Sequence, residues 1–378
     1  MKKYYLITPG PTPVPPTVAA QSALPVLHHR THEFGKLFEQ VMEGLRTVFQ
    51  TKRDVMLITG SGTGAMESAV ANLLSPGDKA IVASCGAFGN RWEKICVAFG
   101  AKVVMLKEEW GQAVDPGKVR QALKENPDAK AVFFTHTETS AGTVNDVKAI
   151  AAVVAETAAV SVVDAISGLA GQELRMDDWK LDVVVSGSQK GLMTAPGLAF
   201  AAVSEKGWKL VESSKNARFY NDYRLIKKSI PNKETPWTPA VSLVASLHEA
   251  IRALMEEGME NVWKRHLRLA KACRAGMQAL NLKLLSAAPC SVLTSAHLPE
   301  SVSGEKLVDW LRDEHGVSIA GGQEHLKGKI VRLAHMGYMD HFDLTIGLTA
   351  LEWGLVKFGH KVDAGKAVKT AQETFLAG

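Results

Sequence analysis

Two charged residues stand directly after short apolar runs of the kind that form buried strands. Lys190 follows the valines at 183–185 after a break of small residues at 186–188, and Asp164 follows the run 160–163. A charge at the end of a buried strand is costly unless it is neutralised or paired. The amine of Lys190 could be taken up in a Schiff base with an aldehyde cofactor. An exposed turn lysine explains this stretch equally well when it is considered alone.

The carboxylate of Asp164 indicates which cofactor could carry such an aldehyde. A protonated pyridine nitrogen is a cationic partner for such a group, and this ion pair makes pyridoxal phosphate an electron sink. A lone aspartate at a strand end is more often a helix cap or a turn residue. The combination of Asp164 and Lys190 on consecutive predicted strands favours a pyridoxal phosphate site.

A glycine-rich stretch offers a place for the phosphate of such a cofactor. Gly60, Gly62 and Gly64 alternate singly between a predicted strand and a predicted helix. Glycines in this position let backbone N–H groups turn toward an anion at the helix N-terminus. The dinucleotide spacing Gly-x-Gly-x-x-Gly is absent. A single phosphate is therefore a better match than a pyrophosphate.

Three further features allow both a ligand and a structural explanation. Phe88, at the start of a predicted helix, could stack on a flat ring or pack as a hydrophobic staple. Arg332 lies on an apolar run at 330–334, and its guanidinium cannot deprotonate. A substrate carboxylate or a structural salt bridge would satisfy it. The loop 25–32 holds three histidines, but their spacing matches no standard zinc site, and we expect no metal.

The amino-acid composition indicates the broad class of protein. The chain has 378 residues, 46% apolar and 22% charged, which suits a soluble protein with one large and one smaller domain. The net charge of +5 is mild and scattered, so we expect no nucleic-acid or membrane partner. No apolar run approaches the ~20 residues that span a bilayer, and the N-terminus does not resemble a signal peptide. Four cysteines without metal or disulfide spacing indicate a cytoplasmic protein.

Alternating strands and helices must position these residues. After an extended, proline-rich arm at 4–16, strands are predicted at 54–59, 79–83, 103–106, 131–135, 160–163, 183–185 and 196–203. Helices are predicted at 17–24, 33–49, 65–74, 116–124 and 146–156, and the loop 85–91 enters another. This alternation predicts an α/β fold with a mostly parallel sheet, whose strands end in polar loops on one edge.

The C-terminal part has a different order. Two long helices, one from residue 240 and one at 257–280, are followed by strands at 283–285, 291–295, 317–319 and 330–334. Helices at 304–314 and 340–358 complete a compact α+β domain. Residues 218–233 are basic and aromatic and show no clear period, so no element is predicted there.

Taken together, these residues resemble the class V aminotransferases, most closely the alanine–glyoxylate and serine–glyoxylate branch. The resemblance covers most of the chain, and the Ser-Gly-Ser-Gln-Lys stretch at 186–190 is its most specific part. Its other parts are the Pro-Gly-Pro-Thr-Pro arm, 60–67, 136–142, 163–165, 331–333 and the Thr-Pro-x-Thr-Pro turn at 235–239. It implies the pyridoxal-phosphate-dependent transferase fold of the aspartate aminotransferase type, with helices on both faces of the sheet. It also implies an N-terminal arm (1–16), a large cofactor-binding domain (17–255) and a small C-terminal domain (256–378).

The resemblance also implies a role for each matching residue. Lys190 would form the Schiff base and carry the proton, and Asp164 would pair with the pyridine nitrogen. Phe88 would stack on the ring, Thr139 would reach the ring hydroxyl, Arg332 would bind the substrate carboxylate, and Gly62, Thr63 and Gln189 would hold the phosphate. Thr235 or Thr238 would reach the phosphate of a neighbouring subunit. The first dozen residues would cross that subunit, so a homodimer with active sites at its interface is implied.

The implied reaction is a ping-pong transfer of an amino group from a small amino acid, alanine or serine, to an oxo acid, glyoxylate. Thr63 stands where well-known glyoxylate enzymes carry histidine, which leaves the donor open. Two alternatives are another class V enzyme, such as a lyase or cysteine desulfurase, and an accessory subunit without cofactor. Desulfurases usually carry histidines where this chain has Gln189 and Phe88, and Cys290 lies at a predicted strand start rather than in a mobile loop. A subset of relatives is labelled as a hydrogenase subunit, although no residue pattern here suggests metal or redox chemistry.

Overall fold

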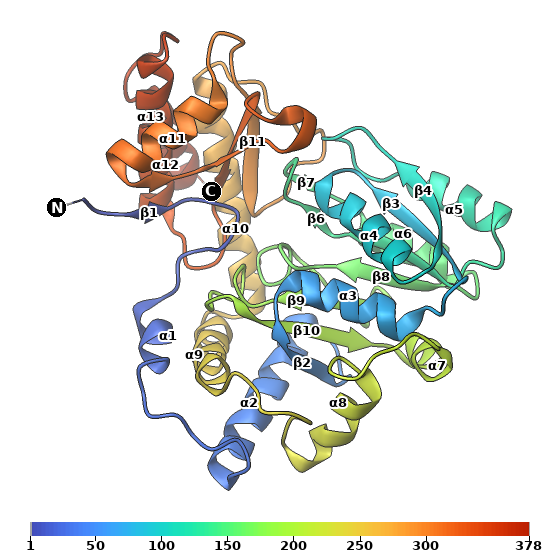
Figure 1. Cartoon of the computed structure of the whole chain (residues 1–378). Helices are drawn as coiled ribbons and strands as arrows, with labels where there is room; N and C mark the ends of the chain where they lie inside the picture. Colours follow the sequence, from blue (N-terminus) through green and yellow to red (C-terminus); the bar gives the residue numbers. More distant parts are fainter. Residues whose placement is uncertain (1, 378) are drawn as a thin grey trace.

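A seven-stranded sheet in the order β2-β10-β9-β8-β5-β3-β4 lies at the centre of the computed structural model, which describes residues 2–377 (Figure 1). Its strands are β2 (Val55–Gly60), β3 (Lys79–Ser84), β4 (Lys102–Lys107), β5 (Ala131–Thr135), β8 (Val160–Asp164), β9 (Val183–Gly187) and β10 (Gly197–Val203). Neighbours from β9 to β4 are parallel, whereas β10 is antiparallel to both β9 and β2. The mostly parallel sheet predicted from the sequence is confirmed.

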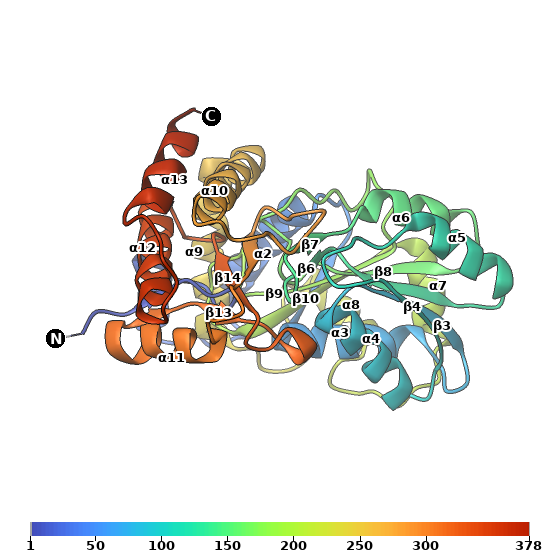
Figure 2. The same cartoon turned by 90° about the horizontal axis from the view of Figure 1, so that it is seen from above.

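Helices cover both faces of this sheet, and Figure 2 shows α5 and α6 on the opposite side from α3 and α4. One face carries α3 (Gly62–Leu73), α4 (Ala87–Ala98), α7 (Glu205–Ser213) and α8 (Tyr223–Ser229), and the other carries α2 (His32–Phe49), α5 (Pro116–Glu125), α6 (Val147–Ala155) and α9 (Val241–Glu257). In β9, Val183 and Val185 pack into the cluster of the first face and Val184 into that of the second. A strand buried on both sides needs a continuous apolar run, which is the pattern seen in the sequence.

The smaller part is built on a three-stranded antiparallel sheet, β11-β14-β13. Its elements are β11 (Leu293–His297), β13 (Ala320–Gly321), β14 (Ile330–Ala334), α10 (Met259–Ala279), α11 (Gly304–His315), α12 (His341–Lys357) and α13 (Lys366–Ala377). The helix α10 belongs to both parts, because Val262 and Trp263 lie in the core of the large part and Leu269 and Cys273 in that of the small one. The predicted division after residue 255 therefore stays a prediction.

Several elements differ from the sequence predictions. Residues 283–285 form no strand, and Leu284 makes only an isolated bridge to Ala296. The helices α7, α8 and α13 were not expected. In α8, the buried Tyr223 and Ile226 lie within the basic stretch whose charges obscured the apolar pattern. No helix among residues 2–377 combines the length and apolar character needed to cross a membrane.

The N-terminal arm packs on its own chain. Strand β1 (Tyr5–Leu6) runs parallel to β12 (Val317–Ser318), and Ile7 is buried in the core of the small part. The backbone N–H of Thr12 then donates to the carbonyl oxygen of Gln189 at 3.2 Å, before α1 (Pro16–Gln21) begins. The crossing of a partner subunit, which the resemblance implies for the first dozen residues, stays a prediction. The apolar side chain of Ile7 finds its core in the same chain.

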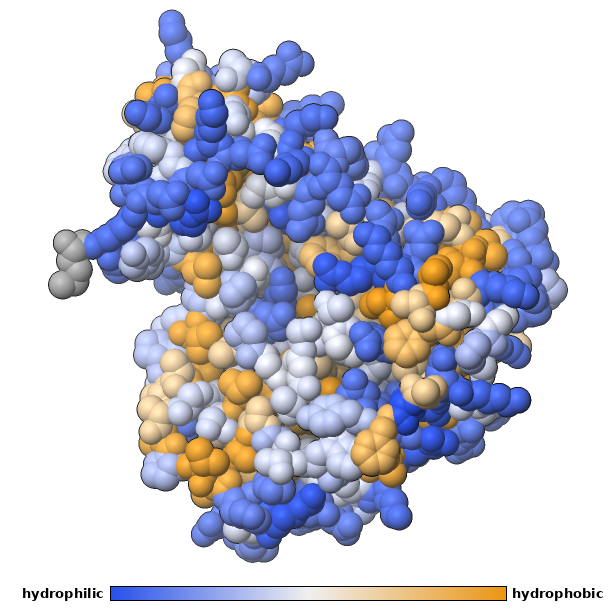
Figure 3. Space-filling model, in the orientation of Figure 1, coloured by the Kyte–Doolittle hydropathy of each residue, from blue (hydrophilic) through white to orange (hydrophobic). Residues whose placement is uncertain are grey.

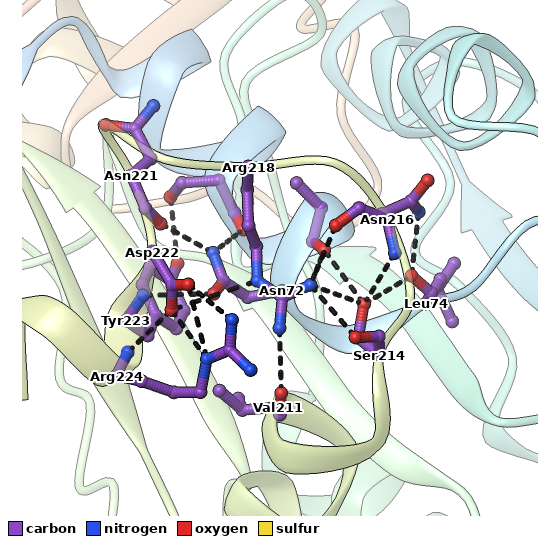
Figure 4. A network of polar contacts seen from close by, with 12 residues as sticks. Asn72, Leu74, Val211, Ser214, Asn216, Arg218, Asn221, Asp222, Tyr223 and Arg224 are labelled. Carbon is purple, nitrogen blue, oxygen red and sulfur yellow. Dashed lines mark hydrogen bonds and ion pairs between the residues drawn. The ribbon is translucent and has the colours of Figure 1, made fainter.

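A polar network ties the connection between α7 and α8 to α3 (Figure 4). Asn72 of α3 donates to the carbonyl oxygen of Asn221 at 2.7 Å and accepts from the backbone N–H of Tyr223 at 3.0 Å. Arg218 donates to several carbonyl oxygens of the same connection. These bonds satisfy polar groups that burial would otherwise leave without partners. They also hold α3, whose N-terminus begins at the edge of the sheet where the parallel strands end.

Candidate active site

The residues that follow β2, β3, β5, β8 and β9 meet at one edge of the sheet. Parallel strands all end on the same side, so a polar residue after each strand is carried to a shared position. The predicted site residues Gly62, Phe88, Thr139, Asp164 and Lys190 are all placed in this way. Arg332 reaches the same edge from the small part.

Lys190 follows the end of β9 by three residues and is largely buried. Its ammonium Nζ donates to the backbone oxygen of Pro9, and its own carbonyl oxygen accepts from Oγ1 of Thr12 at 3.0 Å. Burial lowers the pKa of the amine to about 8, although the Asp164 carboxylate acts to raise it. An amine with this pKa is partly uncharged near neutral pH, so it can serve as a nucleophile or a base.

Asp164 ends β8, and only 3% of it is exposed. Its Oδ1 accepts from the backbone N–H of Ile166 at 2.8 Å, and no described residue donates a hydrogen bond to Oδ2. Burial raises the pKa of the carboxyl to about 7, while the N–H of Ile166 and the charges of Arg91 and Lys190 lower it. Lys190 and Asp164 each favour the charged form of the other. The structure therefore brings them into one site.

The residues predicted to hold a phosphate gather at the N-terminus of α3. Ser61 caps this helix by accepting from the backbone N–H of Gly64 at 3.4 Å, and the preceding N–H groups of Gly62 and Thr63 have no intrahelical partner. The Oε1 atom of Gln189 is buried and has no hydrogen-bond partner among residues 2–377. A Cβ on Gly187 would lie 3.0 Å from this atom and 3.3 Å from the backbone nitrogen of Gly62. The amide of Gln189 and the start of α3 are therefore adjacent.

Phe88 lies in the first turn of α4, beside a residue to which the sequence analysis gave no role. The guanidinium carbon of Arg91 lies 4.8 Å from the centroid of the Phe88 ring, and Nη1 of Arg91 donates to Oγ1 of Thr63 at 2.9 Å. The charge of Arg91 also lowers the pKa values of Asp164 and Lys190. The sequence offered one sign of this contact, because Arg91 follows Phe88 by three residues on a helix.

Glu138 is a second residue that sequence reasoning left without a role. It ends β6 (Thr137–Glu138) and is completely buried. Its carboxylate accepts from the backbone N–H groups of Phe88 and Gly89 at 3.1 and 2.9 Å, and from the N–H and Oγ of Ser140 at 3.1 and 2.6 Å. Burial raises the pKa of Glu138, and these hydrogen bonds act to lower it. An acidic residue just beyond the apolar strand 131–135 is the same signal that singled out Asp164.

Arg332 lies on β14 with 5% of its surface exposed. Its Nη1 donates to the carbonyl oxygen of Thr139 at 2.7 Å, and its Nε donates to that of Gly321 at 2.8 Å. Burial lowers the pKa of the guanidinium to about 10, although the Glu138 charge raises it. Both hydrogen bonds go to neutral carbonyl oxygens rather than to a carboxylate. The salt bridge considered from the sequence is therefore not what holds Arg332.

The two threonines of the Thr-Pro turn lie beside the end of β2, where the backbone N–H of Ala240 donates to Oγ1 of Thr59 at 3.3 Å. Oγ1 of Thr235 donates to the carbonyl oxygen of Trp237 at 2.6 Å, and Oγ1 of Thr238 lies 3.4 Å from Nε2 of His29. Neither hydroxyl is hydrogen-bonded to another predicted site residue of the described chain. Their contact with a neighbouring subunit stays a prediction. No three His, Cys, Asp or Glu side chains between residues 2 and 377 are grouped to hold a metal ion.

The residues at this edge fit pyridoxal phosphate. Oδ2 of Asp164 lacks a donor, and a protonated pyridine nitrogen would supply one together with the missing positive charge. The unpartnered amide of Gln189 can rotate to turn its Nε2 donor toward a phosphate, beside the N–H groups at the start of α3. The Phe88 ring offers a flat face, and Lys190 offers the amine for the aldehyde.

Comparisons with known proteins agree with this geometry. The model of the family "Aminotransferase class-V" matches residues 4–343. The chain is 39% identical to the soluble hydrogenase 42 kDa subunit of Anabaena cylindrica, with 99% of each chain covered. It is 33% identical to the serine–glyoxylate aminotransferase of Methylorubrum extorquens, with 97% of this chain and 94% of that protein covered. The structure of the ureidoglycine–glyoxylate aminotransferase from Bacillus subtilis matches with a TM-score of 0.94 at 29% identity, over 100% of this chain and 99% of that one. The chain has the pyridoxal-phosphate-dependent transferase fold, and it belongs to the class V aminotransferases, a pyridoxal-phosphate-dependent family of enzymes.

Proposed function

We propose that this protein binds pyridoxal phosphate and transfers an amino group from a small amino acid, alanine or serine, to glyoxylate. The observation that carries the proposal is the pairing of the Lys190 amine and the Asp164 carboxylate in one buried site, each favouring the charged form of the other. The glyoxylate enzymes among its relatives supply the acceptor. The similarity to a hydrogenase subunit does not identify a substrate.

Each residue has a defined task in this reaction. Bound pyridoxal phosphate supplies an electron sink and carries the amino group between the two half-reactions. Nζ of Lys190 removes the proton from the α-carbon of the amino donor, and in the reverse half-reaction it returns a proton to the α-carbon of the oxo acid. Asp164 keeps the pyridine nitrogen protonated. Arg332 orients the substrate carboxylate, with Nε and Nη1 held by carbonyl oxygens.

The space beside Lys190 supports a small substrate. The backbone of Gly10 lies against the tip of the Lys190 side chain, and a Cβ at this position would meet its Nζ, Cε and Cδ atoms. Pro9 and Thr12 hold the same segment against the lysine through hydrogen bonds. A substrate whose α-carbon must approach Nζ therefore meets the backbone of the arm. This supports alanine, serine and glyoxylate over substrates with bulky side chains.

The proposal includes a homodimer. Leu24, Val26 and Leu27 are exposed hydrophobic residues between α1 and α2, and Figure 3 shows apolar side chains gathered on this side of the molecule. A hollow of about 430 Å³ lies among them and the side chains of α9. A second copy of the chain would cover this surface and would carry Thr235 or Thr238 to the phosphate of its neighbour.

The cysteine desulfurase alternative finds no reactive thiol at Cys290. This residue is fully buried, and its Sγ donates to the carbonyl oxygen of Leu293 at 3.4 Å. Burial raises the pKa of the thiol above its ordinary value. A nucleophilic cysteine needs access and a lowered pKa.

The test compares Lys190→Ala with Lys206→Ala. Lys206 is a matched control because its amine is also held by backbone carbonyl oxygens, those of Thr157 and Ala159, away from the site. Wild-type protein and Lys206→Ala should show the absorbance of bound cofactor. Borohydride reduction should attach the cofactor to Lys190, as read by mass spectrometry. Lys190→Ala should lose the adduct and the turnover of alanine or serine with glyoxylate.

A panel of donors offered with glyoxylate or pyruvate identifies the substrates. Retention of normal turnover by Lys190→Ala would refute the mechanism. Wild-type protein that binds no cofactor would instead favour the accessory subunit.

A further inference from the structure

The helix that carries Phe88 has no cap of its own. Ser61, Asp115 and Asp146 cap α3, α5 and α6 with their side chains, but the residue in this position of α4 is Gly86. The first N–H groups of a helix need acceptors when they are buried. In α4 the carboxylate of Glu138, at the end of β6, accepts the N–H groups of Phe88 and Gly89, and Oγ of Ser140 accepts that of Ala87.

The carboxylate of Glu138 packs closely against the residues at the start of α4. A Cβ on Gly86 would collide with the carboxyl group of Glu138, so the glycine that leaves α4 without a cap also makes room for the cap from outside. Ser140 adds its N–H and hydroxyl on the other oxygen. A charged acceptor at the positive end of a helix forms stronger hydrogen bonds than a neutral one.

Glu138 connects three of the proposed site residues. It accepts from the N–H of Phe88, it is bonded in sequence to Thr139, and the carbonyl oxygen of Thr139 accepts from Arg332. The ring-stacking side chain from the large part and the carboxylate-binding side chain from the small part are thus joined through one buried group.

We propose that Glu138 is a positioning residue that fixes Phe88, at the cofactor ring, relative to Arg332, at the substrate carboxylate. This inference rests on the proposed function. Glu138 itself touches neither the substrate nor the cofactor in this assignment, because its two oxygens are occupied by the donors of α4 and Ser140.

The most direct variant is Glu138→Gln. It keeps the shape of the side chain but replaces one acceptor oxygen with an NH₂ group. In one orientation that group faces the N–H groups of Phe88 and Gly89, and in the other it faces the N–H of Ser140. A donor facing a donor leaves buried groups unsatisfied. Ser140→Ala is milder, because it leaves the carboxylate in place. It removes the hydrogen bond that the Ser140 hydroxyl donates to Glu138 and the one that it accepts from the N–H of Ala87 at the start of α4.

The chain offers a matched control in Glu352→Gln. Glu352 is also buried, and its carboxylate also accepts two backbone N–H groups at the start of a helix, those of Gly365 and Ala367 at α13. No proposed site residue lies on α13. Glu138 and Glu352 thus both accept backbone N–H groups at the start of a helix, and only Glu138 is connected to the proposed site.

The experiment measures four quantities for the full-length variants: melting temperature, amide exchange in the first turns of α4 and α13, Kd for pyridoxal phosphate, and KM and kcat for the amino donor. Both glutamine variants should lower the melting temperature and speed exchange in their own helix. Only Glu138→Gln should raise the Kd and lower kcat/KM, by about tenfold or more, as expected for misplaced site groups. Ser140→Ala should change both in the same direction by a smaller factor, about fivefold, because the Glu138 carboxylate stays in place.

Equal Kd and kcat/KM values for Glu138→Gln and Glu352→Gln would overturn the positioning role. If Glu138→Gln does not fold, unchanged Kd and kcat/KM values in Ser140→Ala would overturn it instead. Failure of the wild-type protein to bind pyridoxal phosphate would refute the proposed function. Tight binding by the wild type and equally tight binding by Glu138→Gln would refute only the positioning role of Glu138.

Discussion

At the scale of single residues, the site is distinguished by two buried charged groups without a fully matching partner. Asp164 is buried with one backbone donor, and Arg332 is buried against neutral oxygens. A carboxylate or guanidinium in this situation is stabilised by a partner that completes its hydrogen bonds. In the proposed function, the cofactor nitrogen would be the partner of Asp164, and the substrate carboxylate would be the partner of Arg332.

This gives Asp164 a pH signature in the cofactor-free protein. Its pKa is about 7 when folded against 3.8 as a model value, a difference worth about 4 kcal/mol. Because the folded pKa is raised, this carboxyl favours folding most below pH ~4, and the contribution is lost as the pH rises to ~7. Asp164→Asn does not titrate. Cofactor-free Asp164→Asn should therefore gain free energy of unfolding relative to wild type between pH 5 and pH 8, by up to about 4 kcal/mol, as measured by urea unfolding.

Asp222→Asn provides the control of opposite sign. Burial acts to raise the pKa of Asp222, but the hydrogen bonds and charge of Arg224 hold it below its ordinary value. Asp222→Asn should therefore be less stable than wild type at pH 8. With pyridoxal phosphate added, Asp164→Asn should bind it more weakly than wild type does. Cofactor-free Asp164→Asn that is less stable than wild type at pH 8 would show that the carboxylate already has a sufficient partner.

Sequence reasoning brought to one edge of the sheet the candidate residues whose motif or strand position was visible in the chain. Lys190 and Asp164 end apolar runs, and Gly62 starts a helix after a strand, so local pattern placed each of them at the active edge. Arg91 and Glu138 were missed because their importance comes from contacts between segments. Glu138 is 49 residues from Gly89, whose N–H it accepts, and no local pattern reports that the cap of α4 is missing.

At the scale of elements, the proposed phosphate site depends most directly on the N-terminus of α3. A Cβ on Gly62 would lie 2.6 Å from Cδ1 of Ile166, whereas a Cβ on Gly64 would meet no atom within 4 Å. Gly62→Ala should destabilise the protein by about 1–3 kcal/mol through overpacking. It should also weaken cofactor binding, because Ile166 carries the N–H that bonds Asp164. Gly64→Ala should stabilise α3 by up to about 1 kcal/mol.

Urea unfolding and a cofactor titration on both variants check this expectation. Gly64→Ala is the matched control, since it introduces the same methyl group two residues along the same helix. A cofactor Kd that is the same in the two variants would show that the approach of Ile166 to α3 does not shape the site.

Among the elements, those with a strong period or a β-branched run were predicted within a few residues. The strands β5, β8 and β9 are examples. The strand predicted at 283–285 was wrong, because this segment pairs with β11 only at the isolated bridge between Leu284 and Ala296. The helix α8 was missed because Lys227 and Lys228 interrupt its apolar pattern. Tertiary packing decides such short segments.

At the scale of the whole molecule, the N-terminal arm links the two cores to the site. Ile7 packs in the small core, β1 pairs with β12, and Thr12 bonds the backbone on either side of Lys190. The arm therefore lies at the proposed active site of its own chain. Thr235 and Thr238 make no hydrogen bond to a predicted site residue of the described chain, as expected if one of them binds the phosphate of a neighbour. The proposed dimer, in which each chain supplies the turn of the other, agrees with this placement.

Mixing two inactive variants tests that arrangement. One carries Lys190→Ala with intact threonines, and the other carries Thr235→Val and Thr238→Val with an intact lysine. In a mixed dimer, the site that contains Lys190 receives its threonines from the Lys190→Ala chain, so unfolding and refolding the two together should restore part of the activity. Each variant refolded alone should stay inactive or weak. If the threonines served their own chain, every site of the mixed dimer would lack either the lysine or the threonines, and mixing would restore nothing. Restoring Thr235 and Thr238 singly in the second variant then shows which hydroxyl crosses the interface.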